Sequence, residues 1–514
     1  MIFDAARLPS PLHLTADLCV VGSGAGGAMV AMVAAEAGLR VVVVEAGSLL
    51  TPGDMVQREE EMFPRLYWEG GGRTTADRAI HVHQGRGVGG STLHNLNLCK
   101  RIPPSILERW ARERRLEALP RATWDALYDE VEALISVSAV PEDQYNRANR
   151  LLQAGVASLG WRGGGLRHNR TGCLGSGFCE IGCAYDAKNS AAKVLVPRAV
   201  KAGAEIVTRC QAVRVVTSGG RVRGVEAVAI EPGTLRPMGR VTVDAARVCV
   251  SGSATSTPAL LLRSGIPDPG DETGNRLRIH PAVVAAGDFD DPVRAWQGIP
   301  QTYECTEHLD LDAPPGAPRD GSRGKKAWIV PAFAHPVGTA TLVPGHGAAH
   351  RDLMGRYAHL VALTAMIHDD TPGRVRPAGD LGLSIDYWPG DDDRRELAIG
   401  LWACVKLLFA AGARRVFVPS RPVRLLERGE PFDDLRALDI RRGAMDLTAV
   451  HPMASVPMGD DPKVAAVDGR GRHHHVEGLF VADGSLFPSS IGVPPQLSIY
   501  ALGLHVGRAI TKSG

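Results

Sequence analysis

A chain of 514 residues exceeds what one hydrophobic core usually organises, so the sequence predicts two domains. Hydrophobic residues make up 44% of the chain and charged residues 22%, which fits a globular enzyme and argues against a disordered or fibrous protein. The formal net charge of +2 supplies no basic surface of the size that grips a nucleic acid, so nucleic-acid binding is disfavoured.

The N-terminal region lacks the basic, apolar and small-residue order of a secretory signal. No apolar stretch in the sequence is long enough to cross a membrane. We therefore expect a cytoplasmic protein without a transmembrane segment. Most of the nine cysteines are scattered in apolar settings, where a buried thiol is the simple interpretation.

Residues 17–45 predict a nucleotide-binding βαβ unit. An apolar strand leads into Gly22-Ser-Gly24-Ala-Gly-Gly27, an alanine-rich helix follows, and a second apolar strand ends at Glu45. One glycine would allow the sharp turn, one the close approach of a pyrophosphate, and one the packing of helix on strand. A carboxylate at Glu45 suits ribose hydroxyls and repels a 2′-phosphate, so NADP is disfavoured.

A second glycine-rich element reads Gly85-Arg-Gly87-Val-Gly-Gly90-Ser-Thr-Leu-His94-Asn95. A long anionic cofactor needs glycine backbone at several points along its length, and an amide or carboxylate for each set of hydroxyls. The element is therefore a candidate second wall of a cofactor site.

Cys173, Cys179 and Cys183 cluster in a loop whose glycines allow three thiolates to converge. Such thiolate density in a reducing compartment suggests a metal rather than a disulfide. The spacing is not that of the four-cysteine runs of ferredoxins. His168, slightly upstream, would complete a Cys3His zinc site, and a loop without metal is the remaining alternative.

Two further segments extend the nucleotide-binding domain. Residues 205–223 read as two strands around a Ser-Gly-Gly turn, and residues 246–262 read as a strand followed by a leucine-rich helix. The domain is therefore expected to be discontinuous and to comprise residues 1–110, 190–287 and 445–514. Residues 111–189, which carry the cysteine cluster, would form a connecting segment.

Residues 288–444 are richer in prolines, aromatic residues and alternating apolar runs, which fit antiparallel strands that cover a site. We read this segment as the substrate domain. The predicted fold class is α/β, with a Rossmann-like nucleotide-binding domain and an α+β substrate domain built on an antiparallel sheet.

The C-terminal block contains His451-Pro-Met-Ala-Ser-Val-Pro-Met458-Gly459, then Gly478-Leu-Phe-Val-Ala-Asp483-Gly-Ser, then Ile491-Gly-Val-Pro-Pro-Gln-Leu-Ser. Together with the two glycine-rich elements, and in this order, these motifs resemble the glucose-methanol-choline (GMC) oxidoreductases. The correspondence runs from about residue 15 to the C-terminus and is weakest between residues 288 and 360.

The resemblance implies FAD bound in an elongated pose across the Rossmann-like domain. Its ADP half would lie on Gly22, Gly24, Gly27 and Glu45. Asp483 would lie by the pyrophosphate or ribityl chain, and Asn95 with the Gly87–Gly90 turn would lie by the isoalloxazine.

His451 stands where the family has its active-site histidine. An alcohol gives up a hydride easily only as its hydroxyl proton leaves, so a neutral imidazole is the expected base. The resemblance therefore implies hydride transfer from a CH–OH group of a small organic substrate to flavin N5.

The family usually carries a second His or Asn after a Gly-Val pair, and this sequence has Pro494 there. Gln496 would supply a catalytic amide from nearby, or His368 or His280 would fill the space. Alternatively, the substrate reacts at a C–C bond beside a carbonyl, by dehydrogenation, reduction or isomerisation, which needs one base and no alkoxide-stabilising partner.

Two more expectations follow from the resemblance. His94 is similar to the histidine through which choline-oxidase-like members bond covalently to the flavin 8α-methyl, and an unattached histidine near the ring is the alternative. The cysteine loop resembles the segment that holds a 3Fe-4S cluster in bacterial membrane-linked glucose and fructose dehydrogenases. Such a cluster would relay single electrons from flavin to an acceptor protein or quinone, as in a dehydrogenase.

Overall fold

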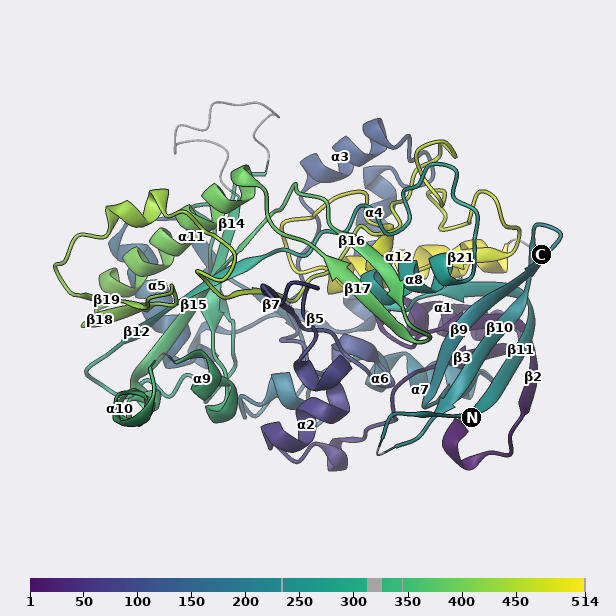
Figure 1. Cartoon of the computed structure of the whole chain (residues 1–514), viewed down its shortest axis with the longest axis horizontal. Coiled ribbons are helices and arrows are strands. Elements are labelled where there is room, and N and C mark those ends of the chain that lie inside the picture. The colour runs from purple at the N-terminus through teal and green to yellow at the C-terminus, as the bar shows by residue number, and fades with distance from the viewer. Residues whose placement is uncertain (233, 312–325, 344, 513–514) are drawn as a thin grey trace.

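The computed structural model describes residues 1–232, 234–311, 326–343 and 345–512. Figure 1 shows two lobes, each built on its own sheet: a nucleotide lobe on the right and a second lobe on the left. Among the described residues, no helix combines the length and apolar character that a bilayer-spanning segment needs.

The sheet of the nucleotide lobe is mostly parallel, as the sequence predicts. Its strand order is β1-β8-β3-β2-β11-β10-β9, with β21 paired to β11 and antiparallel pairing only between β11, β10 and β9. All four valines of β3 are buried, which is typical of an inner parallel strand. The strands are β1 (Ile2–Asp4), β2 (Leu12–Val21), β3 (Val41–Val44), β8 (Glu205–Thr208), β9 (Cys210–Ser218), β10 (Arg221–Ile230), β11 (Pro237–Val250) and β21 (Leu479–Val481).

The predicted βαβ unit is present. Strand β2 leads through a glycine turn into α1 (Ala25–Glu36), and the chain returns as β3 in parallel beside β2. Helix α12 (Gln496–Thr511) packs closely on α1 because glycines face it. A Cβ on Gly503 would lie only 2.8 Å from the carbonyl oxygen of Gly26.

The second sheet is antiparallel over its main path, in the order β19-β18-β12-β15-β14-β13-β6, and β20 pairs with both β12 and β4. Helix α11 (Asp391–Ala410) packs on it, with α5 (Arg147–Ser158) against α11. The strands are β4 (Ile80–Val82), β6 (Gly163–Gly165), β12 (Ala282–Asp288), β13 (Tyr303–Cys305), β14 (Ala327–Ala332), β15 (Leu360–Ile367), β18 (Arg415–Val418), β19 (Arg424–Glu427) and β20 (Leu447–Ala449).

A hairpin from residues 288–444 crosses to the nucleotide lobe. Strands β16 (Arg374–Ala378) and β17 (Gly382–Asp386) pack against α8 (Ser253–Arg263). Arg263 donates a hydrogen bond to the carbonyl oxygen of Gly382, and Gln211 donates one to that of Leu381. The hairpin thereby covers the nucleotide end of the cavity described below.

The remaining helices and strands belong to neither of the two sheets. They are α2 (Glu59–Leu66), α3 (Pro104–Glu113), α4 (Arg121–Leu134), α6 (Ala191–Val194), α7 (Val196–Lys201), α9 (Pro336–Leu342), α10 (Gly347–Gly355), β5 (Val137–Ala139) and β7 (Arg167–Asn169).

Candidate active site

One large cavity, of about 800 Å³, is lined by both lobes. Its volume lies within the range of cofactor and substrate sites. Of the residues predicted to bind cofactor or to act in catalysis, all except Gly27 and Gly87 line it. Those that line it are Gly22, Gly24, Glu45, Gly90, His94, Asn95, His451, Asp483 and Gln496.

The first turn of α1 is open to an anion. Its N-cap, Gly24, makes no side-chain capping bond, so the N–H groups of the first helical turn remain available at the cavity wall. Gly90, from the second glycine-rich element, faces this turn with a φ of +56°, and a Cβ there would lie 2.9 Å from the Gly24 Cα. The two glycine walls therefore approach as closely as backbone allows.

Gly27 and Gly87 shape these walls from behind. A Cβ on Gly27 would overlap the Gly22 carbonyl oxygen, so this glycine lets α1 pack on the turn before it. Gly87 has a φ of +135°, and its backbone lies against Gly47. Both positions need glycine for packing and conformation.

Glu45 is buried at the end of β3 and points back toward the first turn. Its carboxylate accepts hydrogen bonds from the backbone N–H and the hydroxyl of Ser23, at 3.0 and 2.7 Å, and from the N–H of Gly47 at 2.8 Å. An acidic side chain held at the end of the second strand is where dinucleotide folds bind ribose hydroxyls.

Asp483 is also buried at the cavity wall. Its carboxylate accepts from the N–H groups of Ser253 and Ser485, each at 2.8 Å, and from the Thr257 hydroxyl at 2.5 Å. Burial raises the pKa of Asp483, although these hydrogen bonds lower it. The residue ties the start of α8 to the segment after β21.

Asn95 and Gln496 form a pair. The Asn95 amide donates to Gln496 Oε1 at 2.6 Å, and Gln496 Nε2 donates to the Leu98 carbonyl at 2.7 Å and to Asn169 Oδ1 at 3.1 Å. Both ends of the Gln496 amide are thus occupied by protein groups. This arrangement suits a residue that positions Asn95 better than the catalytic amide that the sequence suggests.

Among the described residues, three buried polar side-chain atoms in the wall lack a hydrogen-bond partner. They are His94 Nε2, Asn97 Oδ1 and Arg263 Nε. The ring of His94 lies 4.0 Å from that of Tyr67, and burial holds the pKa of His94 well below its usual range. Buried polar groups normally have partners, so orphaned atoms here point to a ligand. With the open helix start and the carboxylate of Glu45, they fit FAD.

The pairing of strands β12 and β20 brings His451 next to His280. His280 precedes β12 and His451 follows β20, and Ala282 pairs with Thr448 in antiparallel register. The Nδ1 atoms of the two histidines lie 3.2 Å apart, and the N–H of Gly492 lies 3.0 Å from His280 Nε2. His280 therefore takes a place beside His451. His368, the other histidine considered, lies 3.7 Å from Asp370 and is not part of the cavity wall.

The hydrogen bonds assign the ring tautomers of this pair. A backbone N–H can only donate, so His280 Nε2 must accept from Gly492, and the proton of neutral His280 is on Nδ1. That proton is donated to His451 Nδ1, which leaves the proton of neutral His451 on Nε2. Burial lowers the pKa of His451 to about 3, so the ring is neutral at physiological pH.

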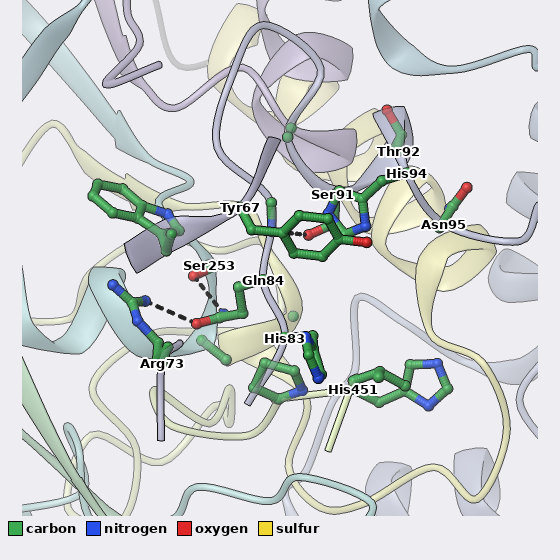
Figure 2. A pocket seen from close by; sticks show the side chains of 18 of the residues that line it. Tyr67, Arg73, His83, Gln84, Ser91, Thr92, His94, Asn95, Ser253 and His451 are labelled. Carbon is green, nitrogen blue, oxygen red and sulfur yellow. Dashed lines mark hydrogen bonds between the residues drawn. The ribbon is translucent and has the colours of Figure 1, made fainter. Parts of the chain in front are cut away.

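Several cavity residues escaped the sequence reasoning. Figure 2 shows Tyr67, His94 and Asn95 along one side of the pocket and His83 near His451. His83 follows β4, which runs parallel to β20, so the pairing brings His83 near His451. Burial lowers the pKa of His83 to about 4. A sequence signal for this neighbour did not exist, because the pairing joins strands from distant parts of the chain.

A hydrogen-bonded chain of Arg73, Gln84 and Ser253 lines the side of the pocket nearer α8 (Figure 2). Arg73 Nη1 donates to Gln84 Oε1, and Gln84 Nε2 donates to the Ser253 hydroxyl, each at 3.0 Å. The guanidinium of Arg73 also lies 5.1 Å from the centre of the Trp68 ring. This network joins the second glycine-rich element to the start of α8.

The cysteine loop does not form a metal centre in this structure. No three or more His, Cys, Asp or Glu side chains within the described ranges are arranged to hold a metal ion. Both ring nitrogens of His168 are engaged, one with the Gln301 carbonyl and one with Arg170, which leaves none for zinc. The structure gives the predicted cluster and its zinc alternative no support.

The loop instead braces the cavity wall. Lys188 donates to the carbonyl oxygens of Asn95 and Cys179, and Tyr67 donates its hydroxyl proton to the Glu180 carbonyl at 2.7 Å. Glu180 lines the cavity, and burial raises its pKa to about 7.

Two family models described as GMC oxidoreductase match residues 63–282 and 369–503. An uncharacterized GMC-type oxidoreductase of Mycobacterium tuberculosis is 36% identical over 504 residues, which cover 97% of this chain and 76% of the relative. One from Sinorhizobium fredii is 30% identical, covering 98% and 96%. A long-chain-alcohol oxidase of Arabidopsis thaliana is 27% identical, covering 98% and 68%.

Solved structures share the fold. Pyridoxine 4-oxidase from Mesorbium loti superposes with a TM-score of 0.71 at 20% identity, covering 96% of this chain and 98% of that one. A formate oxidase variant from Aspergillus oryzae gives 0.72 at 15% identity, covering 98% and 99%. These likenesses confirm the predicted Rossmann-like α/β fold. From the matched models and the 36% identical relative, the chain belongs to the GMC oxidoreductase family.

Proposed function

We propose that this protein oxidises the CH–OH group of a small organic substrate, with His451 as the acid–base residue that contacts the substrate oxygen. The observation that carries the proposal is the place of His451 in the wall of the glycine-lined cavity, with Nδ1 held by His280. Membership of the GMC family makes the chain an FAD-dependent oxidoreductase. When bound, FAD supplies the hydride acceptor, its N5.

The residues that would hold FAD follow from the two walls. Gly22 and Gly24 would admit the pyrophosphate to the start of α1, and Glu45 would accept from ribose hydroxyls. Asp483 and Asn95 would contact the central chain and the ring.

The neutral ring of His451 suits a base, and its tautomer sets the cost of that role. To accept a proton at Nε2, His451 must carry its own proton on Nδ1 instead. The proton of His280 must then move to Nε2, where it faces the N–H of Gly492 and breaks the hydrogen bond from Gly492 to His280. Losing this hydrogen bond costs about 1–3 kcal/mol. That is small beside the roughly 8 kcal/mol or more by which enzymes lower barriers, so the change of tautomer is compatible with the base role.

The cavity wall that the second sheet contributes is largely apolar. Trp328, Met366 and Phe333 contribute to it from the second sheet and the segment after β14. A relative across most of this chain is named a long-chain-alcohol oxidase. Both observations support an alcohol with an apolar body as substrate.

Covalent attachment of the flavin through His94 extends the proposal. The lone pair of a neutral, buried imidazole with a free Nε2 is available for a bond to the 8α carbon of the flavin. A C–H bond of that methyl group would break, its proton would leave to solvent and its electron pair would reduce the flavin, which the electron acceptor of the enzyme would then reoxidise. After acid precipitation we expect the yellow colour in the pellet of the wild type and in the supernatant of His94→Ala. Colour in the supernatant of both proteins would contradict attachment.

Anaerobic mixing with a panel of primary and secondary alcohols tests the main proposal. We expect at least one alcohol to bleach the flavin band. His451→Ala should retain the band but lose roughly 100-fold or more in the bleaching rate. Admitting air or a quinone then identifies the electron acceptor. Absence of bleaching by every alcohol would overturn the proposal.

A second function is favoured by the tautomer of His451. In the tautomer that the hydrogen bonds assign, His451 can donate its Nε2–H to a carbonyl oxygen of a substrate without any proton shift between the histidines. Chemistry at a C–C bond beside a carbonyl requires such a donor. Pro494 also replaces the second polar side chain that the family usually has. If this function is correct, Pro494→Asn will not improve alcohol turnover, and either enones will reoxidise pre-reduced flavin or the corresponding saturated ketones will bleach the oxidised flavin. Faster alcohol turnover by Pro494→Asn would argue against it.

A further inference from the structure

Helix α9 forms one wall of the cavity at the side of α2. Gly338, Thr341 and Leu342 line the cavity, and their spacing of three and four places them on one face of the helix. Figure 1 shows α9 between α2 and α10 at the edge of the molecule. The side chain of Leu342 is part of the wall and yet the residue is 55% exposed, so the cavity opens to solvent here.

The helix has little apolar packing to hold it in place. Neither α9 nor α10 contains a buried residue among those described, and Val337 is 54% exposed. Helices in proteins are stabilised mainly by packing of an apolar face. Segments with few buried apolar contacts open locally at low free energy.

A single carboxylate from another element caps the helix. Glu59, buried at the start of α2, accepts from the N–H of Val337 at 2.6 Å through Oε2 and from that of Gly338 at 2.8 Å through Oε1. His335, the N-cap residue, makes no side-chain capping bond. The negative charge also lies at the positive end of the helix dipole.

The residue before the helix is fixed. The ring of His335 stacks on Phe178 at 4.5 Å and meets the edge of Phe333 at 5.3 Å. Motion of α9 would therefore pivot after His335 and break the bonds to Glu59.

We propose that α9 is the movable wall through which substrate enters, that Glu59 holds it closed, and that Leu342 limits the apolar chain admitted. The inference rests on the proposed function for its substrate class, an alcohol with an extended apolar chain. Phe63 and Phe333 line the same cavity as Leu342 and add apolar surface to it, which suits such a chain.

Amide hydrogen exchange tests the latch whatever the substrate is. In the FAD-loaded protein, the Glu59→Gln variant has an amide in place of the carboxylate. The NH₂ group of that amide cannot accept a hydrogen bond, so one of the two backbone N–H groups at the start of α9 loses its partner. We expect exchange in residues 337–343 to accelerate roughly tenfold, with the flavin spectrum unchanged. Glu60→Gln, at the exposed neighbouring position, is the control and should exchange like the wild type. Unchanged exchange in Glu59→Gln would overturn the latch.

Chain-length kinetics test the role of Leu342. For Leu342→Trp we expect kcat/KM with dodecanol to fall roughly tenfold while that with butanol changes less than about twofold. Val337→Trp, on the outer side of the same helix, should keep the wild-type preference. Equal losses with both alcohols would overturn the selection by Leu342. If the wild type oxidises no alcohol, the proposed function fails, while the exchange result still decides the latch.

Discussion

His280 and His451 face each other through their Nδ1 atoms at 3.2 Å, and the N–H of Gly492 decides which ring carries the proton between them. The two rings are nearly perpendicular, at 82°. Because the backbone N–H of Gly492 can only donate a hydrogen bond, His280 accepts from it and donates to His451. His280 itself does not line the cavity. We therefore expect His280 to act as a positioning residue for His451.

Removing this donor should impair catalysis through His451. For His280→Ala we expect kcat to fall roughly 10–100-fold with KM for the alcohol nearly unchanged, because His451 loses its orientation. His280→Asn, whose amide can donate to His451, should recover part of the rate. Exposed His13→Asn is the control. Equal activity in the Ala and Asn variants would show a merely structural role.

The low pKa of His451 predicts a flat pH profile. A base acts when unprotonated, so kcat/KM falls only as the pH drops through the pKa of about 3 that burial produces. We therefore expect constant kcat/KM between pH 5 and pH 8, measured by anaerobic flavin reduction. An acid limb near 6.5, the ordinary histidine value, would contradict the assignment.

Buried histidines should make the protein less stable in mild acid. Burial lowers the pKa of His83, His368 and His473 to about 4 and that of His451 to about 3, from 6.5. The unfolded chain binds protons below 6.5 while the native chain does not. Stability is therefore complete above pH 6.5 and declines toward pH 4, by up to about 1.4 kcal/mol per pH unit for each histidine. A urea midpoint equal at pH 7 and pH 5 would refute this.

Gly90→Ala should weaken FAD binding. The substitution adds a Cβ 2.9 Å from the Gly24 Cα at a φ of +56°, so the two glycine walls must separate. We expect at least a tenfold higher Kd for FAD by titration of the apoprotein. Gly53→Ala, where a Cβ meets only the Thr51 hydroxyl at 3.7 Å, should bind like the wild type.

Gln496→Ala should act on structure more than on the chemical step. It leaves the amide of Asn95 and the carbonyl of Leu98 without their partner, which costs about 1–3 kcal/mol. We expect a lower thermal midpoint and weaker flavin binding, whereas Gln153→Ala on the exposed side of α5 changes neither. Lost turnover with midpoint and flavin affinity intact would instead make Gln496 catalytic.

The local motifs could be predicted because each is contained in a short stretch of chain. The glycines from Gly22 to Gly27 and the acid at Glu45 belong to one strand–helix–strand unit, so their spacing alone predicts a nucleotide site, and the structure confirms the unit itself. The flanking motif of His451 predicted an active-site residue, and the structure brings this side chain to the cavity wall. For the same reason the cysteine cluster looked like a metal site, since spacing does not tell whether thiols converge in space.

Tertiary structure alone decided the rest. His280 lies 171 residues before His451 and reaches it only because β12 pairs with β20. Glu59 caps a helix 278 residues away, and the β16–β17 hairpin crosses to the other lobe. Hydrophobic periodicity and helix propensity are properties of a few neighbouring residues. These contacts depend instead on strand register and on which backbone N–H groups lack a partner. The local sequence determines neither of these two features.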